Sequence, residues 1–388
     1  MPAAAPAAES RADAHFLRRL LDWLDAGSRT RWLIAGLLLT TALPWFFSCP
    51  LFPEHPEARV YWSGYWSDIV GRKVADPLYD YGRHFPAERN EAKRTFRLVV
   101  PLAATLTHSG MTGVHVTRFA LQAVLLVALL LAAERAWGGD RLAALGLALA
   151  VAGTTVGTAV WRDACYWFDN CAYAFLALAL LARGPWVAGS AILLGAFVDE
   201  RVLLAMPLVA VYHLGLRSPR SVAAALALAV PAYLAIRLGL THLFGLTTSL
   251  GGIALSSILT TNLPSAPAAF WFSLEGGWLI VGLAAWRLGL DRRAAALLGC
   301  AALVLVAAGC VEDFTRSASY AFPAVLAAAA WLTQGATPAG AKVGLRRWTG
   351  WAAAVSILVP NAMILGTGVQ FESSLPVRAL LAWLRTLG

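Results

Sequence analysis

The chain has 388 residues, of which 59% are hydrophobic and only 14% are charged. A soluble domain carries about 25% charged residues, so this composition excludes a water-exposed globule and indicates a polytopic membrane protein. The formal net charge is +9. The basic residues lie mostly in short segments between apolar runs, which favours an effect of membrane topology over a nucleic-acid partner.

Residues 1–30 are predicted to form a cytoplasmic N-terminal tail. Residues 1–11 are rich in Ala and Pro, a composition typical of disorder. Between residues 12 and 26, apolar side chains recur on one helical face and charged side chains on the other. This pattern predicts an interfacial amphipathic helix, with packing against other protein as the alternative.

Residues 31–368 are predicted to form an all-α bundle of about eleven membrane spans, each matched to a hydrocarbon core of ~30 Å. The apolar runs are 31–49, 114–134, 142–160, 171–183, 186–199, 202–216, 221–243, 268–286, 294–310, 317–334 and 348–368. Several runs have only 13–15 residues. Such short helices are expected to cross only where protein or water surrounds them.

The positions of lysine and arginine predict the orientation of the bundle. Cytoplasmic loops carry an excess of these residues, so the loops that hold them are placed inside together with the N-terminus. The basic residues of the predicted inner loops are Arg135, Arg141, Arg183, Arg217, Arg220, Arg287, Arg292, Arg293, Lys342, Arg346 and Arg347. The protein is therefore expected in the cell inner membrane, with residues 369–388 forming an external interfacial helix.

Residues 50–113 are predicted to be a long first external loop. Within it, residues 98–108 are apolar. A crossing at this point would invert every later loop, so the segment is expected to be a lateral or re-entrant helix.

Under this topology, polar residues converge on the external face. A charge at membrane depth costs about 2.5–3.5 kcal/mol on insertion scales, so such residues are expected to be paired or functional. The groups are Asp68, Arg72, Asp76, Asp80, Arg83 and His84; Trp161, Arg162, Asp163, Trp167 and Asp169; Asp199, Glu200 and Arg201; Glu275; and Glu312, Asp313, Thr315 and Arg316. Solvated turns, local ion pairs and ordinary loop polarity stay open as alternatives. Arg237 could snorkel to the interface or bind an anion.

Two short segments carry a resemblance to a known family. Residues 93–101, K-R-T-F-R-L-V-V-P, are similar to R-L-x-x-P-type segments of bacterial membrane proteins. Residues 313–317, D-F-T-R-S, followed by Pro323, are similar to D-x-T-R-S segments. With its long first external loop and short spans, the chain resembles the GT-C superfamily, which are integral-membrane glycosyltransferases that use polyprenyl-phosphate sugars.

The resemblance implies transfer of a sugar from a lipid-linked donor to a glycan, lipid or protein acceptor at the external, periplasmic face. An acid of the first loop is then the base, and Asp80, with Asp76 second, is predicted for this role. No adjacent D-x-D or E-x-D pair occurs in that loop. Arg201 and Arg316 are predicted to hold the phosphate. The other predicted substrate-binding residues are Asp313, Asp199, Glu200, Asp163, Trp167, Arg237, Glu275 and His84.

Other functions stay open at this point. Glu275 beside Gly276-Gly277 also suits a transporter or flippase of a lipid-linked or anionic substrate. A polysaccharide polymerase or ligase and a membrane acyltransferase are further alternatives. No cofactor is assigned, and a divalent metal held by the acids is kept open. Membrane lipids are expected as partners, and no nucleic acid is expected.

Overall fold

The protein is described by a computed structural model. It covers residues 26–48, 56–86, 89–163, 165–247, 261–289, 291–311, 313–334, 339–359, 361–365 and 368–371, with a few single residues nearer the ends. Most of the predicted N-terminal helix at 12–26 and of the C-terminal helix at 369–388 lies outside the described residues, as does Glu312.

Helices dominate the described part of the chain. The N-terminal half contains α2 (Arg29–Ser48), α3 (Pro56–Ala75), α4 (Tyr81–His84), η1 (Ala92–Arg94), α5 (Val99–Leu106), α6 (Gly110–Ala136), α7 (Arg141–Ala152), α8 (Thr155–Arg162), α9 (Asp169–Leu181) and α10 (Pro185–Ala196). The C-terminal half contains α11 (Arg201–Gly215), α12 (Arg220–Phe244), η2 (Leu263–Ser265), α14 (Ala266–Leu274), α15 (Gly277–Leu288), α16 (Arg292–Gly309), α17 (Phe314–Ala318), η3 (Ser319–Ala321), α18 (Pro323–Gln334) and α19 (Ala339–Leu358).

Among the described residues, four helices are long and apolar enough to cross a membrane, namely α2, α6, α12 and α16. The number rises to six if the bent pairs α7–α8 and α14–α15 each count as one span. Each of the eleven predicted apolar runs contains a helix. The helical, membrane-compatible nature of the chain is therefore established, while the number of crossings stays a prediction.

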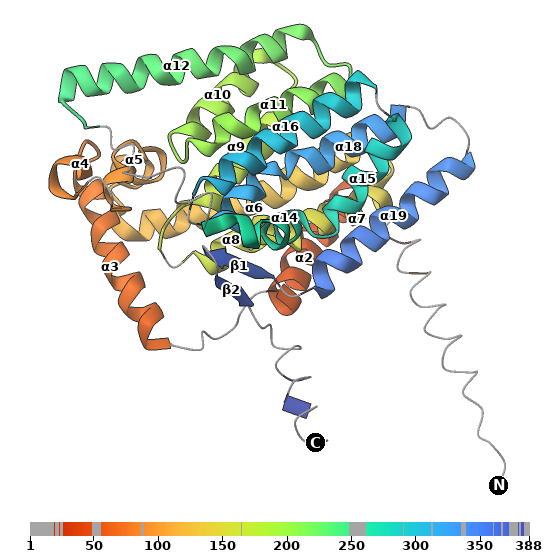
Figure 1. Cartoon of the computed structure of the whole chain (residues 1–388), viewed down its shortest axis with the longest axis horizontal. Helices are drawn as coiled ribbons and strands as arrows, with labels where there is room; N and C mark the ends of the chain where they lie inside the picture. Colours follow the sequence, from red (N-terminus) through yellow and green to blue (C-terminus); the bar gives the residue numbers. More distant parts are fainter. Residues whose placement is uncertain are drawn as a thin grey trace.

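The shortest helices lie inside the bundle. In α9, eleven of the thirteen residues are buried, and in α18 every residue from Pro323 to Ala330 is buried. Helix α18 packs against α6, α7, α9, α11, α15 and α16. Figure 1 shows the same arrangement, with these helices running across the middle of the molecule. Protein thus surrounds these segments, as their shortness requires in a membrane.

Contacts sort the helix ends into two groups. At one end, the start of α2 meets α6 through Arg29 and Glu134, and α19 meets the residue before α7 through Arg346 and Asp140. At the other end, the starts of α9 and α11 meet α17. Figure 1 shows α3, α4 and α5 together at that second end, with α3 inclined steeply to the central helices. The assignment of either end to the inside or the outside, and of the loops to the two faces, stays a prediction.

A short hairpin follows the last helix in a chain that is otherwise helical over its described residues. Helix α19 ends at Leu358, and β1 (Ala362–Leu365) and β2 (Gly368–Phe371) pair as an antiparallel hairpin. The last helix therefore ends ten residues before the predicted residue 368, and residues 369–371 form a strand where helix was predicted; most of the remaining segment up to 388 lies outside the described residues. A run of apolar residues does not distinguish a helix from a short buried strand.

Two predicted spans are also broken. The segment predicted as 142–160 bends by 48° between α7 and α8, and the segment predicted as 268–286 bends by 94° between α14 and α15. The first break falls at Gly153 and Thr154 and the second at Glu275 and Gly276. The glycines at both breaks allow α19 to approach closely, because a Cβ would lie 2.6 Å from the Ser356 carbonyl oxygen at Gly153 and 1.9 Å from the Ala352 carbonyl oxygen at Gly276.

Candidate functional site

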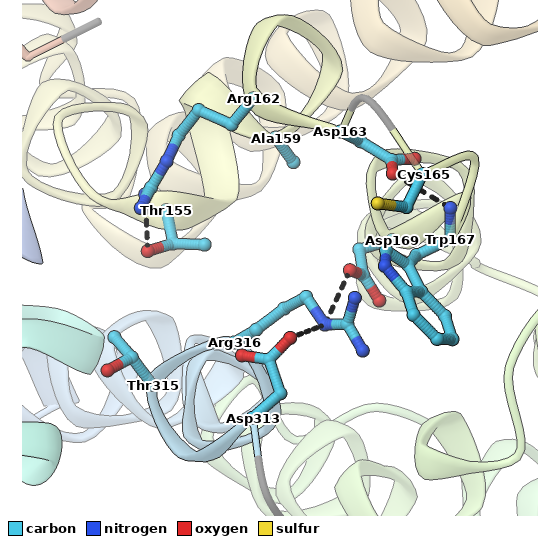
Figure 2. Close-up of a pocket in the computed structure, with 10 residues that line it drawn as sticks. All are labelled: Thr155, Ala159, Arg162, Asp163, Cys165, Trp167, Asp169, Asp313, Thr315 and Arg316. Carbon is cyan, nitrogen blue, oxygen red and sulfur yellow. Dashed lines mark hydrogen bonds and ion pairs between the residues drawn. The ribbon is translucent and has the colours of Figure 1, made fainter. Parts of the chain in front are cut away.

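A pocket opens where the ends of α8, α9 and α17 meet. Figure 2 shows Arg162 on one wall and Arg316 on another, with Trp167 beside the Arg316 guanidinium. The lining residues are Thr155, Ala159, Arg162, Asp163, Cys165, Trp167, Asp169, Asp313, Thr315 and Arg316. The pocket encloses about 560 Å³, part of it open to solvent. Two arginines, three aspartates and one indole therefore face a single space.

The loop between α8 and α9 is folded around Asp163. Its two carboxylate oxygens accept hydrogen bonds from the backbone N–H groups of Trp167 at 2.8 Å and Phe168 at 2.9 Å. Tyr166 and Phe168 have φ angles of 54° and 64°, which non-glycine residues rarely adopt. Arg118 of α6 holds the same loop, because its Nη2 donates to the Asp163 carbonyl at 2.7 Å. Asp163 therefore shapes the pocket wall.

A chain of alternating charges runs behind the pocket. Asp199 lies 2.8 Å from Nη2 of Arg97 and 2.7 Å from Nη2 of Arg201. Arg201 also contacts Asp169 at 2.9 Å, and Asp169 contacts Arg316 at 3.1 Å. Since Arg201 and Arg316 share Asp169, the two arginines predicted to bind phosphate do approach one another.

The charged side chains of this series shift one another's pKa values. Burial alone would raise the pKa of Asp199, but Arg201 and Arg97 together hold it well below its usual range. Burial alone would lower the pKa of Arg316, but Asp169 and Asp313 raise it above its usual range. Both groups therefore stay charged at neutral pH, and the buried charges are compensated by neighbours of opposite sign.

The guanidinium nitrogens of Arg201 already donate to groups of the protein, so few hydrogen bonds remain for a ligand. Its Nε donates to Asp199 at 2.8 Å, Nη1 donates to Ser317 Oγ at 2.6 Å and Nη2 contacts Asp169 and Asp199. Tyr320 lies against its guanidinium, 4.7 Å from ring centroid to Cζ. We conclude that Arg201 fastens α11 to α9 and α17 and lies behind the pocket.

Arg316 differs because only one edge of its guanidinium is held. Nε lies 2.8 Å from Asp313 Oδ2 and 3.1 Å from Asp169 Oδ2, without good hydrogen-bond alignment to either. Among the described residues, its two terminal nitrogens have no hydrogen-bond acceptor. Trp167 stacks on the guanidinium at 4.3 Å. The open edge is a planar fork of N–H donors, which suits a phosphate or a carboxylate.

Asp313, at the pocket rim, also has a carboxylate oxygen that is able to accept a further hydrogen bond. Its Oδ2 faces Arg316, whereas its Oδ1 accepts no hydrogen bond within the described part of the chain. Thr315 beside it is held differently, because its Oγ1 accepts the N–H of Ile364 in β1 at 3.1 Å. The pocket therefore presents a donor fork and an unsatisfied carboxylate oxygen on neighbouring side chains.

Trp167 is the centre of an aromatic and cationic stack. Arg94 lies between two indole rings, 4.0 Å from the centroid of Trp66 and 4.3 Å from that of Trp167. Arg94 also donates to the carbonyls of Cys165 at 2.8 Å and Tyr166 at 3.1 Å. Cation–π contacts of desolvated groups contribute about 2 kcal/mol. The first loop thus fixes the indole that faces the pocket.

Asp80, predicted as the base, lies outside the pocket lining and is 7% exposed. It is the N-cap of α4 and accepts from Gly82 N at 3.0 Å. The N–H and hydroxyl of Thr247, the residue third after α12, donate to it at 2.9 Å, and Thr95 donates at 3.2 Å. Arg83 adds an ion pair at 3.2 Å. Asp80 thus ties the first loop to the end of α12.

The other predicted residues outside the pocket occupy several places. Asp76 accepts from Leu78 N in an exposed turn, and His84 stacks on Tyr79. Arg237 lies over the Phe96 ring and donates to Tyr233. Glu200 is exposed in the turn before α11. Glu275 is fully buried at the α14–α15 break.

Sequence reasoning missed several residues of the site. Arg162, Asp169 and Thr315 were in the polar groups but had no assigned role, and Arg94 and Arg97 lay in the motif of the resemblance. The pairing of these arginines with Trp167 and Asp199 depends on contacts about 70 and 100 residues apart. Nothing in local spacing signals such contacts. In the described ranges, no group of three or more His, Cys, Asp or Glu could hold a metal ion.

Comparison with known proteins gives no assignment. No family model, no curated protein and no solved structure matches the chain. The functional argument therefore depends on the pocket itself.

Proposed function

We propose that this chain is a glycosyltransferase of the inner membrane. It moves a sugar from a polyprenyl-phosphate donor to an acceptor hydroxyl at the external face. One observation supports this proposal most directly. Arg316, whose two terminal nitrogens are open, and Asp313, whose Oδ1 accepts no hydrogen bond from the described residues, both line one pocket.

In this mechanism, Arg316 binds the donor phosphate with its two terminal nitrogens. Its charge stabilises the negative charge that gathers on the phosphate as the bond to the sugar breaks. Asp169 and Asp313 hold the guanidinium at Nε, so the fork is oriented before the donor arrives. Trp167 presents an indole face at the same wall, a surface on which a sugar ring can stack.

Asp313 is the general base in this proposal. It takes the proton of the acceptor hydroxyl while the acceptor oxygen bonds to the anomeric carbon, and the electron pair of the broken C–O bond leaves with the lipid phosphate. Asp313 replaces Asp80 as the preferred base because the Asp80 oxygens already accept hydrogen bonds from four donor groups and face Arg83. A carboxylate so occupied cannot reach a hydroxyl without first losing those contacts.

The decisive experiment compares Asp313→Asn with Asp80→Asn in purified protein supplied with a polyprenyl-phosphate sugar. Asp313→Asn is expected to lower turnover by on the order of 10²–10⁴-fold, because the amide cannot accept the proton. Asp80→Asn is expected to keep most of the turnover of a folded enzyme. The reverse result would assign the role of base to Asp80 of the first loop. Wild-type turnover in both variants would refute base catalysis by either acid.

Transport of an anionic or lipid-linked substrate is a second candidate function. The two bent helix pairs favour it, since broken helices line the binding sites of many transporters. Flux of such a substrate across proteoliposomes without sugar transfer would support transport. A membrane acyltransferase has less support, because no histidine lines the described pocket.

A further inference from the structure

Two arginines of the first loop hold the short loop between α8 and α9. Arg94 donates to the carbonyls of Cys165 at 2.8 Å and Tyr166 at 3.1 Å. Arg97 donates to the carbonyl of Trp167 at 2.9 Å. Three consecutive carbonyl groups are therefore bound by side chains of a segment about 70 residues away, which fixes the backbone that carries Trp167.

Ring contacts continue from Arg94 to Arg316. The Arg94 guanidinium lies 4.0 Å from the ring centroid of Trp66 and 4.3 Å from that of Trp167. The Arg316 guanidinium also lies 4.3 Å from the Trp167 ring centroid. One indole therefore contacts both the buried arginine of the first loop and the arginine to which the proposed mechanism assigns the donor phosphate.

The Trp167 ring helps to orient Arg316. The two carboxylates that contact this arginine, those of Asp169 and Asp313, both lie at its Nε. A guanidinium that is held at one nitrogen can still turn about the bonds of its side chain. Figure 2 shows the indole against the guanidinium, where it limits that movement. The direction of the two terminal nitrogens therefore depends on where Trp167 lies.

Packing alone does not account for an arginine at position 94. Arg94 is 3% exposed, and its Nε has no hydrogen-bond partner among the described residues. Burial, followed by the charge of Arg97, lowers the pKa of Arg94 to about 9, so the group stays charged at neutral pH. A buried charge costs free energy that an apolar side chain of similar volume would avoid. The planar, charged group is therefore expected to serve a purpose beyond filling space.

We propose that Arg94 is a positioning residue of the phosphate site, which acts on Arg316 through Trp167. The inference rests on the proposed function, because it assigns Arg94 to the site that binds the lipid-linked donor. Arg94 holds the indole, and the indole holds the two terminal nitrogens of Arg316 in the direction of the donor phosphate. The first loop thereby contributes to donor binding without supplying the base.

The test measures direct binding of farnesyl phosphate, a short prenyl phosphate without a sugar, to the purified full-length chain by isothermal titration calorimetry. Arg94→Met is expected to raise the Kd about tenfold, the scale of a desolvated cation–π contact. Arg94→Lys should also raise the Kd, because a compact ammonium group cannot contact two indoles and two carbonyls at once. Arg89→Met removes an exposed arginine that lies over Phe85, and it should leave the Kd unchanged.

A double-mutant cycle distinguishes positioning of Arg316 from general support of the fold. In an Arg316→Lys background, Arg94→Met is expected to raise the Kd less than about twofold, because the fork that Arg94 positions is already lost. Two independent roles would instead multiply the two effects. The thermal unfolding midpoint of each variant is measured in parallel.

Three results would overturn the inference alone. A folded Arg94→Lys variant with wild-type affinity would do so even if Arg94→Met did not fold. A lowered unfolding midpoint with an unchanged Kd would identify a purely structural arginine, and multiplied effects in the cycle would exclude action through Arg316. In all three cases the wild-type chain still binds farnesyl phosphate. A wild-type chain that does not bind it would also refute the phosphate site of the proposed function.

Discussion

Arg316 and Arg201 have the same chemistry but different capacities to bind a ligand. Asp199, Asp169 and Ser317 occupy the nitrogens of Arg201, whereas the outer edge of Arg316 is open. The sequence predicted the same phosphate-binding role for both but could not rank them, because the ranking depends on partners that lie 32 and 116 residues from Arg201.

Substitution of Arg316 with lysine tests the importance of the fork. Lysine keeps the charge but replaces two parallel donors with one compact ammonium group. We expect Arg316→Lys to raise the KM for the lipid-phosphate donor by about tenfold or more and to lower kcat, because a bidentate contact is lost. Steady-state kinetics over a range of donor concentrations provides the measurement. Unchanged kinetics would show that Arg316 does not contact the phosphate.

At the scale of the elements, the turn between α10 and α11 is fastened to the first loop. Arg97 pairs with Asp199, and Leu98 N donates to the Phe197 carbonyl at 2.8 Å. Asp199→Asn would leave Arg97 and Arg201 without the carboxylate they share. We expect a loss of about 3–5 kcal/mol in the free energy of unfolding, typical of a broken buried pair.

Glu200, the residue that follows Asp199, provides the matched control. Glu200 is exposed in the same turn, so Glu200→Gln should change the free energy of unfolding by less than about 0.5 kcal/mol. Unfolding of both variants in detergent, followed by circular dichroism, gives the comparison. If the two substitutions cost the same, Asp199 does not act as the buried anchor.

The sequence predicted the helices well, because an apolar run long enough for a helix is a strong local signal. It did not predict the bends at Gly153 and Glu275, although Gly153-Thr154 and Glu275-Gly276-Gly277 interrupt the apolar pattern, because each whole segment is long enough for one continuous span. It also missed the β1–β2 hairpin, although Pro360-Asn361 and Gly366-Thr367-Gly368 are turn signals in the sequence. The pocket was anticipated only as a set of external turns. Its actual lining depends on how those turns pack together.

At the scale of the whole molecule, contacts divide the helix ends into two groups, and basic loops predict that the Arg29–Glu134 end is cytoplasmic. Single cysteines at Ser67 in α3 and Ser221 in α12, in a background without native thiols, test this orientation in intact cells. We expect an impermeant thiol reagent to label the Ser67 site and to spare the Ser221 site until the membrane is opened. Labelling of the Ser221 site alone would invert the topology and place the pocket on the cytoplasmic side.

The hairpin that follows α19 also affects how the protein is made. Its Ile364 N–H completes the hydrogen bonding of Thr315 on the pocket wall, and β1 packs against α14 and α17. Synthesis proceeds from the N-terminus, so every helix from α2 to α19 leaves the ribosome before this strand does. Insertion of the helices can therefore begin during translation, but the pocket wall is assembled only after this strand has left the ribosome.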